Sequence, residues 1–179
     1  KASYNRMSQY LHLISNTQSP TPLDVWTPSD DFLKPQLLDQ FAVGYFRNFE
    51  NGKYTLEVES FYKKIKNRLD YIDGADLIAN DAIEQVILDG NARAYGLEVL
   101  LRKNKGAFQG WIAYTLSKSE QKTSPRNENE IGINNGQWYN TPYDKPHDLS
   151  IYGAYTVNDR WKINSNFIYQ TGLPTNYPI

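Results

Sequence analysis

Apolar and polar residues alternate with a period of two along six separate segments of this chain, and no other feature restricts its fold as much. A short turn joins the members of each pair of segments, and two of the turns carry Asn-Gly or Asn-Asp, which favour tight hairpins. The predicted strands are 36–50, 53–66, 92–103, 107–119, 147–157 and 160–171. The predicted turns are 50–53, 103–106 and 157–160. We therefore expect an all-β, antiparallel up-and-down meander with the three turns at one end.

Long polar segments join the hairpins to one another. They are 1–35, 67–91 and 120–146, and they are rich in Asn, Asp, Pro, Ser and Thr. We predict loops here, and the sequence allows one helical turn over 81–88. Transmembrane β-barrels alternate in this way, with short turns on the periplasmic side and long loops outside.

One side of each predicted strand is far more apolar than the other. Taking every second residue, apolar or aromatic residues occupy 23 of 28 positions on one side and 10 of 30 on the other. A soluble β-sandwich would show the same alternation, with the apolar side turned inward. We expect Leu97 and Val99 on the apolar side and Glu98 on the polar side.

The placement of the aromatic residues separates the barrel from the sandwich. Nearest the short turns are Phe49, Tyr54, Phe108, Tyr155 and Trp161, and nearest the long loops are Tyr62, Tyr95, Tyr114 and Tyr169. Mainly aliphatic residues lie between the two groups. Aromatic girdles at both ends of an aliphatic band are typical of a barrel that faces lipid. Six strands cannot close such a barrel, so we expect open edges on the first and last predicted strands.

Composition excludes several functional classes. The net charge is -1, which gives no basic surface for nucleic acid, and the chain has no cysteine. No run of about 18 apolar residues is present, so no transmembrane helix is predicted. The chain carries no motif of a common hydrolase, nucleotide-binding loop or metal site, and we expect no catalytic residue, no metal and no cofactor. The two histidines, His12 and His147, are expected to have structural or surface roles.

Four loop aromatics are the candidates for ligand binding. They are Trp26, Trp138, Tyr139 and Tyr143. Aromatic rings stack on sugars and other flat ligands, so the 120–146 loop is expected to lie outside the cell and to help capture a ligand. The alternative is that the rings only pin the loop together, or that the loop only shields the barrel mouth.

Several strings resemble the late barrel region of TonB-dependent outer-membrane receptors of the Bacteroidetes type. The most specific are Arg93–Glu98 (RAYGLE) and Gly110–Ser117 (GWIAYTLS), with support from Ser19–Trp26 (SPTPLDVW) and Tyr169–Pro174 (YQTGLP). The resemblance implies a barrel of about 22 strands, a plug domain in its lumen, and nutrient uptake driven by the TonB complex. Residues 1–179 would be a partial barrel, with the plug, the TonB-binding segment and the other strands outside this chain.

The expected role is therefore active nutrient uptake across the outer membrane of a Gram-negative bacterium, with no enzymatic chemistry. The expected partners are outer-membrane lipid, the receptor's own plug, the TonB complex and a nutrient ligand, which could be a siderophore, cobalamin, a glycan or a peptide. Two alternatives remain. One is a passive porin-like channel, and the other is a secreted carbohydrate-binding β-sandwich that uses the loop aromatics.

Overall fold

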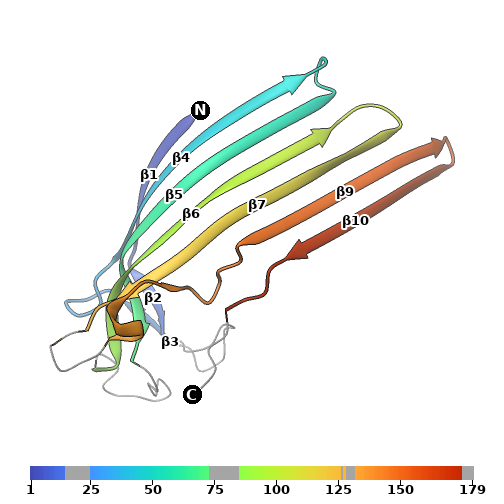
Figure 1. Ribbon diagram of the computed structural model, residues 1–179. Coiled ribbons are helices and arrows are strands. Elements are labelled where there is room, and N and C mark those ends of the chain that lie inside the picture. Colours follow the sequence, from blue (N-terminus) through green and yellow to red (C-terminus); the bar gives the residue numbers. More distant parts are fainter. Residues whose placement is uncertain (15–24, 73–84, 126, 128–131, 175–179) are drawn as a thin grey trace.

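The long strands of this chain form one antiparallel sheet in which each strand pairs with the next long strand along the sequence (Figure 1). The computed structural model describes residues 1–14, 25–72, 85–125, 127 and 132–174. The sheet order is β1 (Ala2–Gln9), β4 (Gln36–Phe49), β5 (Tyr54–Tyr71), β6 (Ile87–Lys103), β7 (Phe108–Thr123), β9 (His147–Asn158) and β10 (Trp161–Gln170). The sheet does not close on itself.

Four smaller elements lie at the end of the sheet opposite the hairpin turns. Strands β2 (Leu11–Ile14) and β3 (Val25–Pro28) form a separate two-stranded sheet. The short 3-10 turn η2 (Ile133–Gly136) precedes β8 (Tyr139–Asn140), which pairs with β7. Figure 1 shows these elements together at one end, which is called the loop end below.

The six strands predicted from sequence are confirmed as β4, β5, β6, β7, β9 and β10, and their three turns lie together at the other end (Figure 1). In the first turn Glu50, Asn51 and Gly52 all have positive φ, as a tight hairpin requires. Neighbouring turns are also tied together. The amide of Asn104 donates to the carbonyl of Lys53 at 2.8 Å, and the amide of Thr156 donates to that of Ala107 at 2.8 Å.

The expectation of a loop over 1–35 is wrong in part, because Ala2–Gln9 forms β1 and pairs with β4 from Ala2↔Val43 to Gln9↔Gln36. The edge of the first predicted strand is therefore not open. In the path of long strands, the edges belong to β1 and β10. Every residue of β1 is exposed, and its sequence has no apolar side, so hydrophobic periodicity could not reveal it.

The predicted loops 67–91 and 120–146 are also shorter than expected, because β5 extends to Tyr71, β6 begins at Ile87 and β7 extends to Thr123. Of the helical turn allowed over 81–88, the described part has Gln85 in 3-10 conformation, and strand β6 begins at Ile87. Ile87 and Leu88 are strand residues paired with Tyr71 and Asp70. Residues 81–84 lie outside the described part of the chain.

The register confirms that the apolar residues of the six predicted strands share one face. Directly opposed residues of antiparallel strands point to the same side, so each series of partners is a row across the sheet. One such row runs Tyr45–Val58–Val99–Tyr114–Leu149–Tyr169. The next row toward the turns runs Arg47–Leu56–Leu101–Ile112–Ile151–Phe167. We call this side the apolar face and the opposite side the polar face.

The apolar face is exposed. On this face Val43 is 65% exposed and Ile163 is 62% exposed. On the polar face Ala42 and Ala154 are only 8% and 3% exposed. Leu97 is 41% exposed and lies on the apolar face, and its neighbour Glu98 lies on the polar face in line with Glu59. Within the described residues, no second sheet covers the apolar face.

The apolar face ends in charged residues at the loop end. Along β5 the band runs from Tyr54 to Tyr62, which is nine residues counted inclusively, and Lys64 follows it at the loop end. At about 3.3 Å per residue those eight steps measure about 26 Å along the strand. On the turn side the last two rows of the band include charges at single positions, Arg47 opposite Leu56 and Lys103 opposite Tyr54.

The small buried core lies at the loop end. Ile14 and Leu33 pack with Leu69 and Ile87, which belong to the extended ends of β5 and β6. His12 is 1% exposed, and its ring hydrogen-bonds Ser29 Oγ at 2.9 Å. Burial lowers the pKa of His12, so it remains a neutral, structural histidine. No helix in the described part of the chain is long and apolar enough to cross a membrane.

Gly96 marks a close approach between β6 and its neighbours. A Cβ added there would lie 2.7 Å from the Leu116 carbonyl oxygen and 3.0 Å from a ring carbon of Phe61. We predict that Gly96→Val destabilises the protein by about 1–3 kcal/mol, because the strands must move apart. Gly172→Val should change stability by less than about 0.5 kcal/mol, because a Cβ there meets nothing within 4 Å. Urea unfolding followed by circular dichroism measures both, and equal midpoints would contradict the packing described.

Candidate functional site

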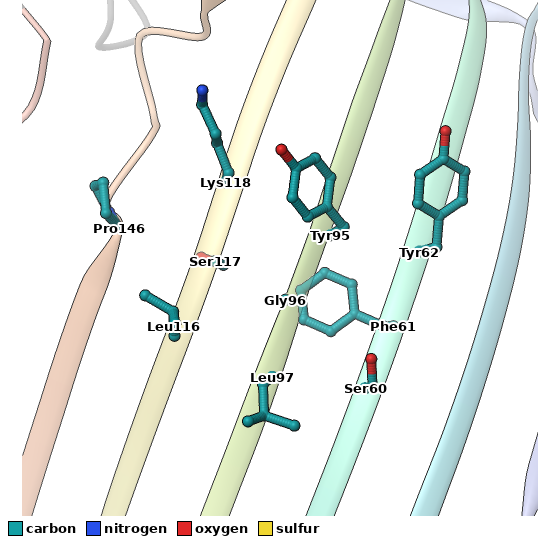
Figure 2. A pocket seen from close by; sticks show the side chains of 10 residues that line it. All are labelled: Ser60, Phe61, Tyr62, Tyr95, Gly96, Leu97, Leu116, Ser117, Lys118 and Pro146. Carbon is teal, nitrogen blue, oxygen red and sulfur yellow. The ribbon is translucent and has the colours of Figure 1, made fainter.

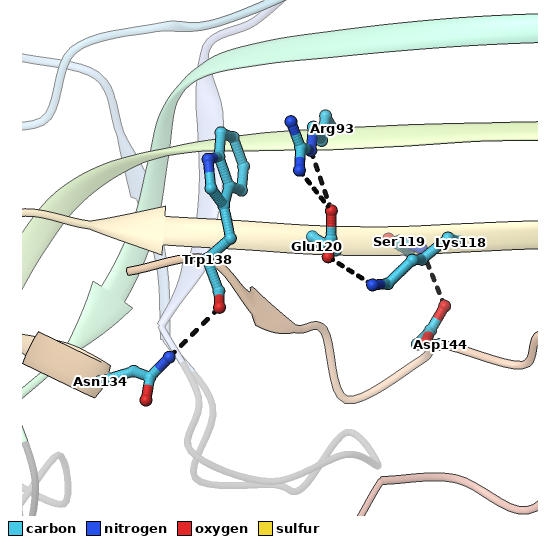
Figure 3. Close-up of polar contacts among 7 residues, drawn as sticks. All are labelled: Arg93, Lys118, Ser119, Glu120, Asn134, Trp138 and Asp144. Carbon is cyan, nitrogen blue, oxygen red and sulfur yellow. Dashed lines mark hydrogen bonds and ion pairs between the residues drawn. The ribbon is translucent and has the colours of Figure 1, made fainter. Parts of the chain in front are cut away.

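The segment after β7 folds back onto the ends of the central strands, and we call residues 132–146 the return segment. Asp144, which is 2% exposed, accepts a hydrogen bond from the Ser119 amide at 2.8 Å (Figure 3). The amide of Thr141 donates to the Ser119 carbonyl at 3.0 Å. Both backbone polar groups of one β7 residue therefore bind the return segment, which fixes where its aromatic residues lie.

Trp138 packs against an ion-pair cluster on β6 and β7. The guanidinium of Arg93 lies 4.2 Å from the centre of the Trp138 ring, in cation–π contact. The same guanidinium binds Glu120 at 2.8 Å, and Lys118 binds the other oxygen of Glu120 at 2.7 Å. Asn134 donates from its side-chain amide to the Trp138 carbonyl at 3.2 Å (Figure 3). Arg93 thus occupies one face of the indole ring.

Tyr139 points to the opposite side of the sheet and enters a polar cluster. Its hydroxyl donates to the Asp70 carboxylate at the end of β5, and Thr123 Oγ lies 2.8 Å from the same hydroxyl. The Gln121 amide also donates to Asp70. Burial, followed by the hydrogen bond to Asp70, raises the pKa of Tyr139, so its phenol keeps the proton that it donates. The cluster joins β5, β7 and β8.

Trp26 and Tyr143 are exposed, at 59% and 60%. Trp26 lies on β3 opposite Leu13, and Tyr143 lies between β8 and β9. Within the described residues, no ring contact joins Trp26 or Tyr143 to Trp138 or Tyr139. The four predicted aromatics therefore form no single stacking site. Trp138 and Tyr139 make contacts that hold the return segment, whereas the rings of Trp26 and Tyr143 are exposed.

His147 lies at the start of β9, where its Nδ1 is 2.7 Å from the hydroxyl of Tyr114. His12 is buried on β2, a different element. Within the described residues, no group of three or more His, Cys, Asp or Glu side chains could hold a metal ion.

A hollow of about 720 Å³ lies over the centre of the sheet, bounded by Tyr62, Tyr95, Leu97, Leu116 and Lys118 among others. Figure 2 shows the Lys118 ammonium and the hydroxyls of Tyr62 and Tyr95 all directed toward the loop end, with the two leucines nearer the turns. The volume falls within the range of about 300–1,000 Å³ typical of ligand sites. The hollow is lined by Leu97 and Leu116 on the side of the turns, and the Lys118 ammonium lies at its rim on the side of the loop end.

Sequence reasoning missed the residues that hold the return segment. Asp70 and Tyr139 are 69 residues apart, and Arg93 and Glu120 are 27 apart. No local pattern links such positions, although the correct strand register alone would have placed Arg93 opposite Glu120.

Comparison with protein-family models, with the curated proteins and with the solved structures finds no match to this chain.

We predict that removing the Tyr139 hydroxyl from the Asp70 cluster loosens the return segment. Tyr139→Phe removes the hydroxyl that donates to Asp70, and should weaken docking of the return segment by about 1–3 kcal/mol. Hydrogen exchange of the amides in residues 132–146 measures this as a loss of protection. Tyr143→Phe, at a side chain that is 60% exposed, is the matched control and should leave protection unchanged. Equal protection in wild type and Tyr139→Phe would show that the cluster does not hold the segment.

Proposed function

We propose that this chain is a wall segment and loop region of a TonB-dependent outer-membrane receptor for active nutrient uptake. The strands would belong to a barrel of about 22, and β1 and β10 would continue the sheet into strands outside this chain. The apolar face would contact lipid, and the polar face would line a lumen occupied by the receptor's plug. The proposal combines the resemblance stated above with the physical character of the two faces.

The observation that carries the proposal is the uncovered apolar band with charges beyond it at the loop end. Nine residues from Tyr54 to Tyr62 match the 9–11 that a tilted strand needs to cross a bilayer. The band ends at the aromatic row Tyr4–Phe41–Tyr62–Tyr95, as at a membrane–water interface. Exposure of such a face to water would be costly, at about 25 cal/mol per Å² of apolar surface.

The other face fits a lumen. Glu59, Glu98 and Asp148 lie in one row on it, and Arg102 lies in another. Wide barrels have polar interiors because water or a plug contacts them. Phe46 and Ile168 are apolar exceptions on this face and are suited to packing against a plug.

A β-sandwich needs two stacked sheets, and the long strands here form one layer. That observation favours the barrel over the secreted carbohydrate-binding alternative. A porin-like channel would share the wall described here and would differ by lacking a plug. The two are separated by uptake in a strain without TonB. Uptake through a receptor stops there, and diffusion through a porin continues.

Because Leu97 lies on the apolar face and Glu98 on the polar face, substitutions at the two positions should differ in their effect on the stability of the full-length protein. Leu97→Arg should lower stability in the bilayer by about 1–2 kcal/mol, because the charge enters lipid one row inside the aromatic border. Glu98→Gln, one residue away on the polar face, should cost much less. Urea unfolding from lipid vesicles, followed by tryptophan fluorescence, measures both. Equal costs would mean that the two faces are wrongly assigned.

The loop 124–137 is proposed to lie outside the cell and to help capture the ligand. The test replaces residues 124–137 alone, because Gln121, Thr123 and Tyr139 on either side bind one another and Asp70. A short Gly-Ser linker there should leave outer-membrane assembly intact, because the ladder and the apolar band are untouched.

The readout is growth on single sources of ferric siderophore, cobalamin, glycan or peptide. Gene deletion first identifies the nutrient that the protein imports. The linker variant should then grow slowly on that nutrient, whereas a control with Gly-Ser at Asp159 and Arg160, in a turn at the opposite end, should grow normally. Normal growth of the linker variant would leave the loop with a shielding role only.

A further inference from the structure

We propose that the loop-side border of the apolar face is a binding site for a phosphate-bearing lipid, with an acyl chain in the hollow beside Tyr62 and Tyr95 and the phosphate among basic side chains beyond them. The inference rests on the proposed function, because it needs the apolar face to contact lipid. It adds a preference for one chemical class of lipid at one place on the wall.

The border is strongly basic. In the aromatic row and the two rows beyond it, the apolar face carries Arg6, Lys64, Lys66, Arg93, Lys118 and Lys122. The same rows carry two carboxylates, Asp39 and Glu120. Six cations against two anions leave four positive charges, although the whole chain has a net charge of -1. Asp89 lies one row further from the band.

Three of these cations are free to bind an outside anion. Arg6 pairs with Asp39 at 3.3 Å, and Arg93 and Lys118 share Glu120. Lys64, Lys66 and Lys122 have no ion pair within the described residues. Lys64 and Lys66 are exposed, and they follow Tyr62 at every second position of β5. Tyr62, Lys64 and Lys66 therefore point to one face.

The hollow continues from these charges into the apolar band. Lys118 at its rim pairs across the strands with Tyr95, and Leu97 and Leu116 pair in the row below. The tyrosine hydroxyls and the Lys118 ammonium point toward the loop end, while their apolar stems lie along the hollow (Figure 2). Side chains arranged in this way keep polar tips at an interface and apolar bodies in hydrocarbon.

These features select a lipid over other anions. A nucleic acid or an acidic protein would meet the charges but not the adjacent apolar hollow, whereas a neutral lipid would leave three lysines without a counterion. A phosphate-bearing lipid satisfies both parts, and each basic residue near a membrane surface adds about 1 kcal/mol of attraction to anionic lipid.

The test uses the full-length protein in phosphatidylcholine vesicles that contain spin-labelled phosphatidic acid or spin-labelled phosphatidylcholine with the same chains. Electron paramagnetic resonance gives the relative affinity of each for the protein surface. Wild type should prefer phosphatidic acid, and Lys64→Gln with Lys66→Gln and Lys122→Gln should lower that preference about fivefold or more. Lys63→Gln with Lys105→Gln and Lys162→Gln is the control and should keep it, since Lys63 and Lys162 lie on the polar face and Lys105 in a hairpin turn.

A second arm tests the hollow. Ser60→Trp fills it without changing charge and should reduce the immobilised fraction of phosphatidic acid, while Ser165→Trp, on the apolar face of β10, should not. An unchanged preference in the lysine variant, or an unchanged immobilised fraction in Ser60→Trp, would overturn the proposal. If inorganic phosphate displaces the lipid more than chloride does at equal ionic strength, the border recognises free phosphate and the lipid assignment is wrong.

The outcomes also separate this inference from the proposed function. Failure of the wild-type protein to enter vesicles would count against the receptor wall itself. Entry into vesicles without a preference for phosphatidic acid would count against this inference alone.

Discussion

The hydrogen-bonded ladder between neighbouring strands fixes the register, and the register decides every other property of this sheet. A slip of one residue would turn each strand over and exchange the apolar and polar faces. The observed register puts Val58, Val99 and Tyr114 in one row, and Lys64, Arg93 and Glu120 in another. The band, its charged border and the hollow all follow from this single alignment. Within this alignment, the absence of a side chain at Gly96 allows β6 to lie close to its neighbours.

The parts of the fold that hydrophobic alternation encodes could be predicted from the sequence. Strands β4 to β7, β9 and β10 each have one apolar side, and their turns carry residues suited to tight hairpins. Strand β1 could not be predicted, because both of its sides are exposed at the sheet edge and select no pattern. The ends of β5, β6 and β7 were missed because residues such as Arg68 and Asp70 are polar, and pairing with neighbouring strands extends the ladder there.

The candidate site was predictable in composition but not in arrangement. The sequence identifies aromatic residues in polar loops, yet it does not tell a ring that stacks on a ligand from one that holds a loop. Contacts make that distinction here: Arg93 covers Trp138, and Asp70 holds Tyr139, while Trp26 and Tyr143 stay exposed. The basic border was missed for a related reason, since its six residues come from four strands and gather only when rows are formed.

The wide range of sequence separations among these contacts has a consequence for how the chain reaches its fold. Phe49 meets Tyr54 after a turn of four residues, so each hairpin closes a very short loop at little entropic cost. Ala2 must find Val43, and Tyr139 must find Asp70, 69 residues away. Contacts between distant residues form slowly. The hairpins can therefore assemble before β1 and the return segment arrive, and the unpaired edge of β4 is exposed to other chains in that interval.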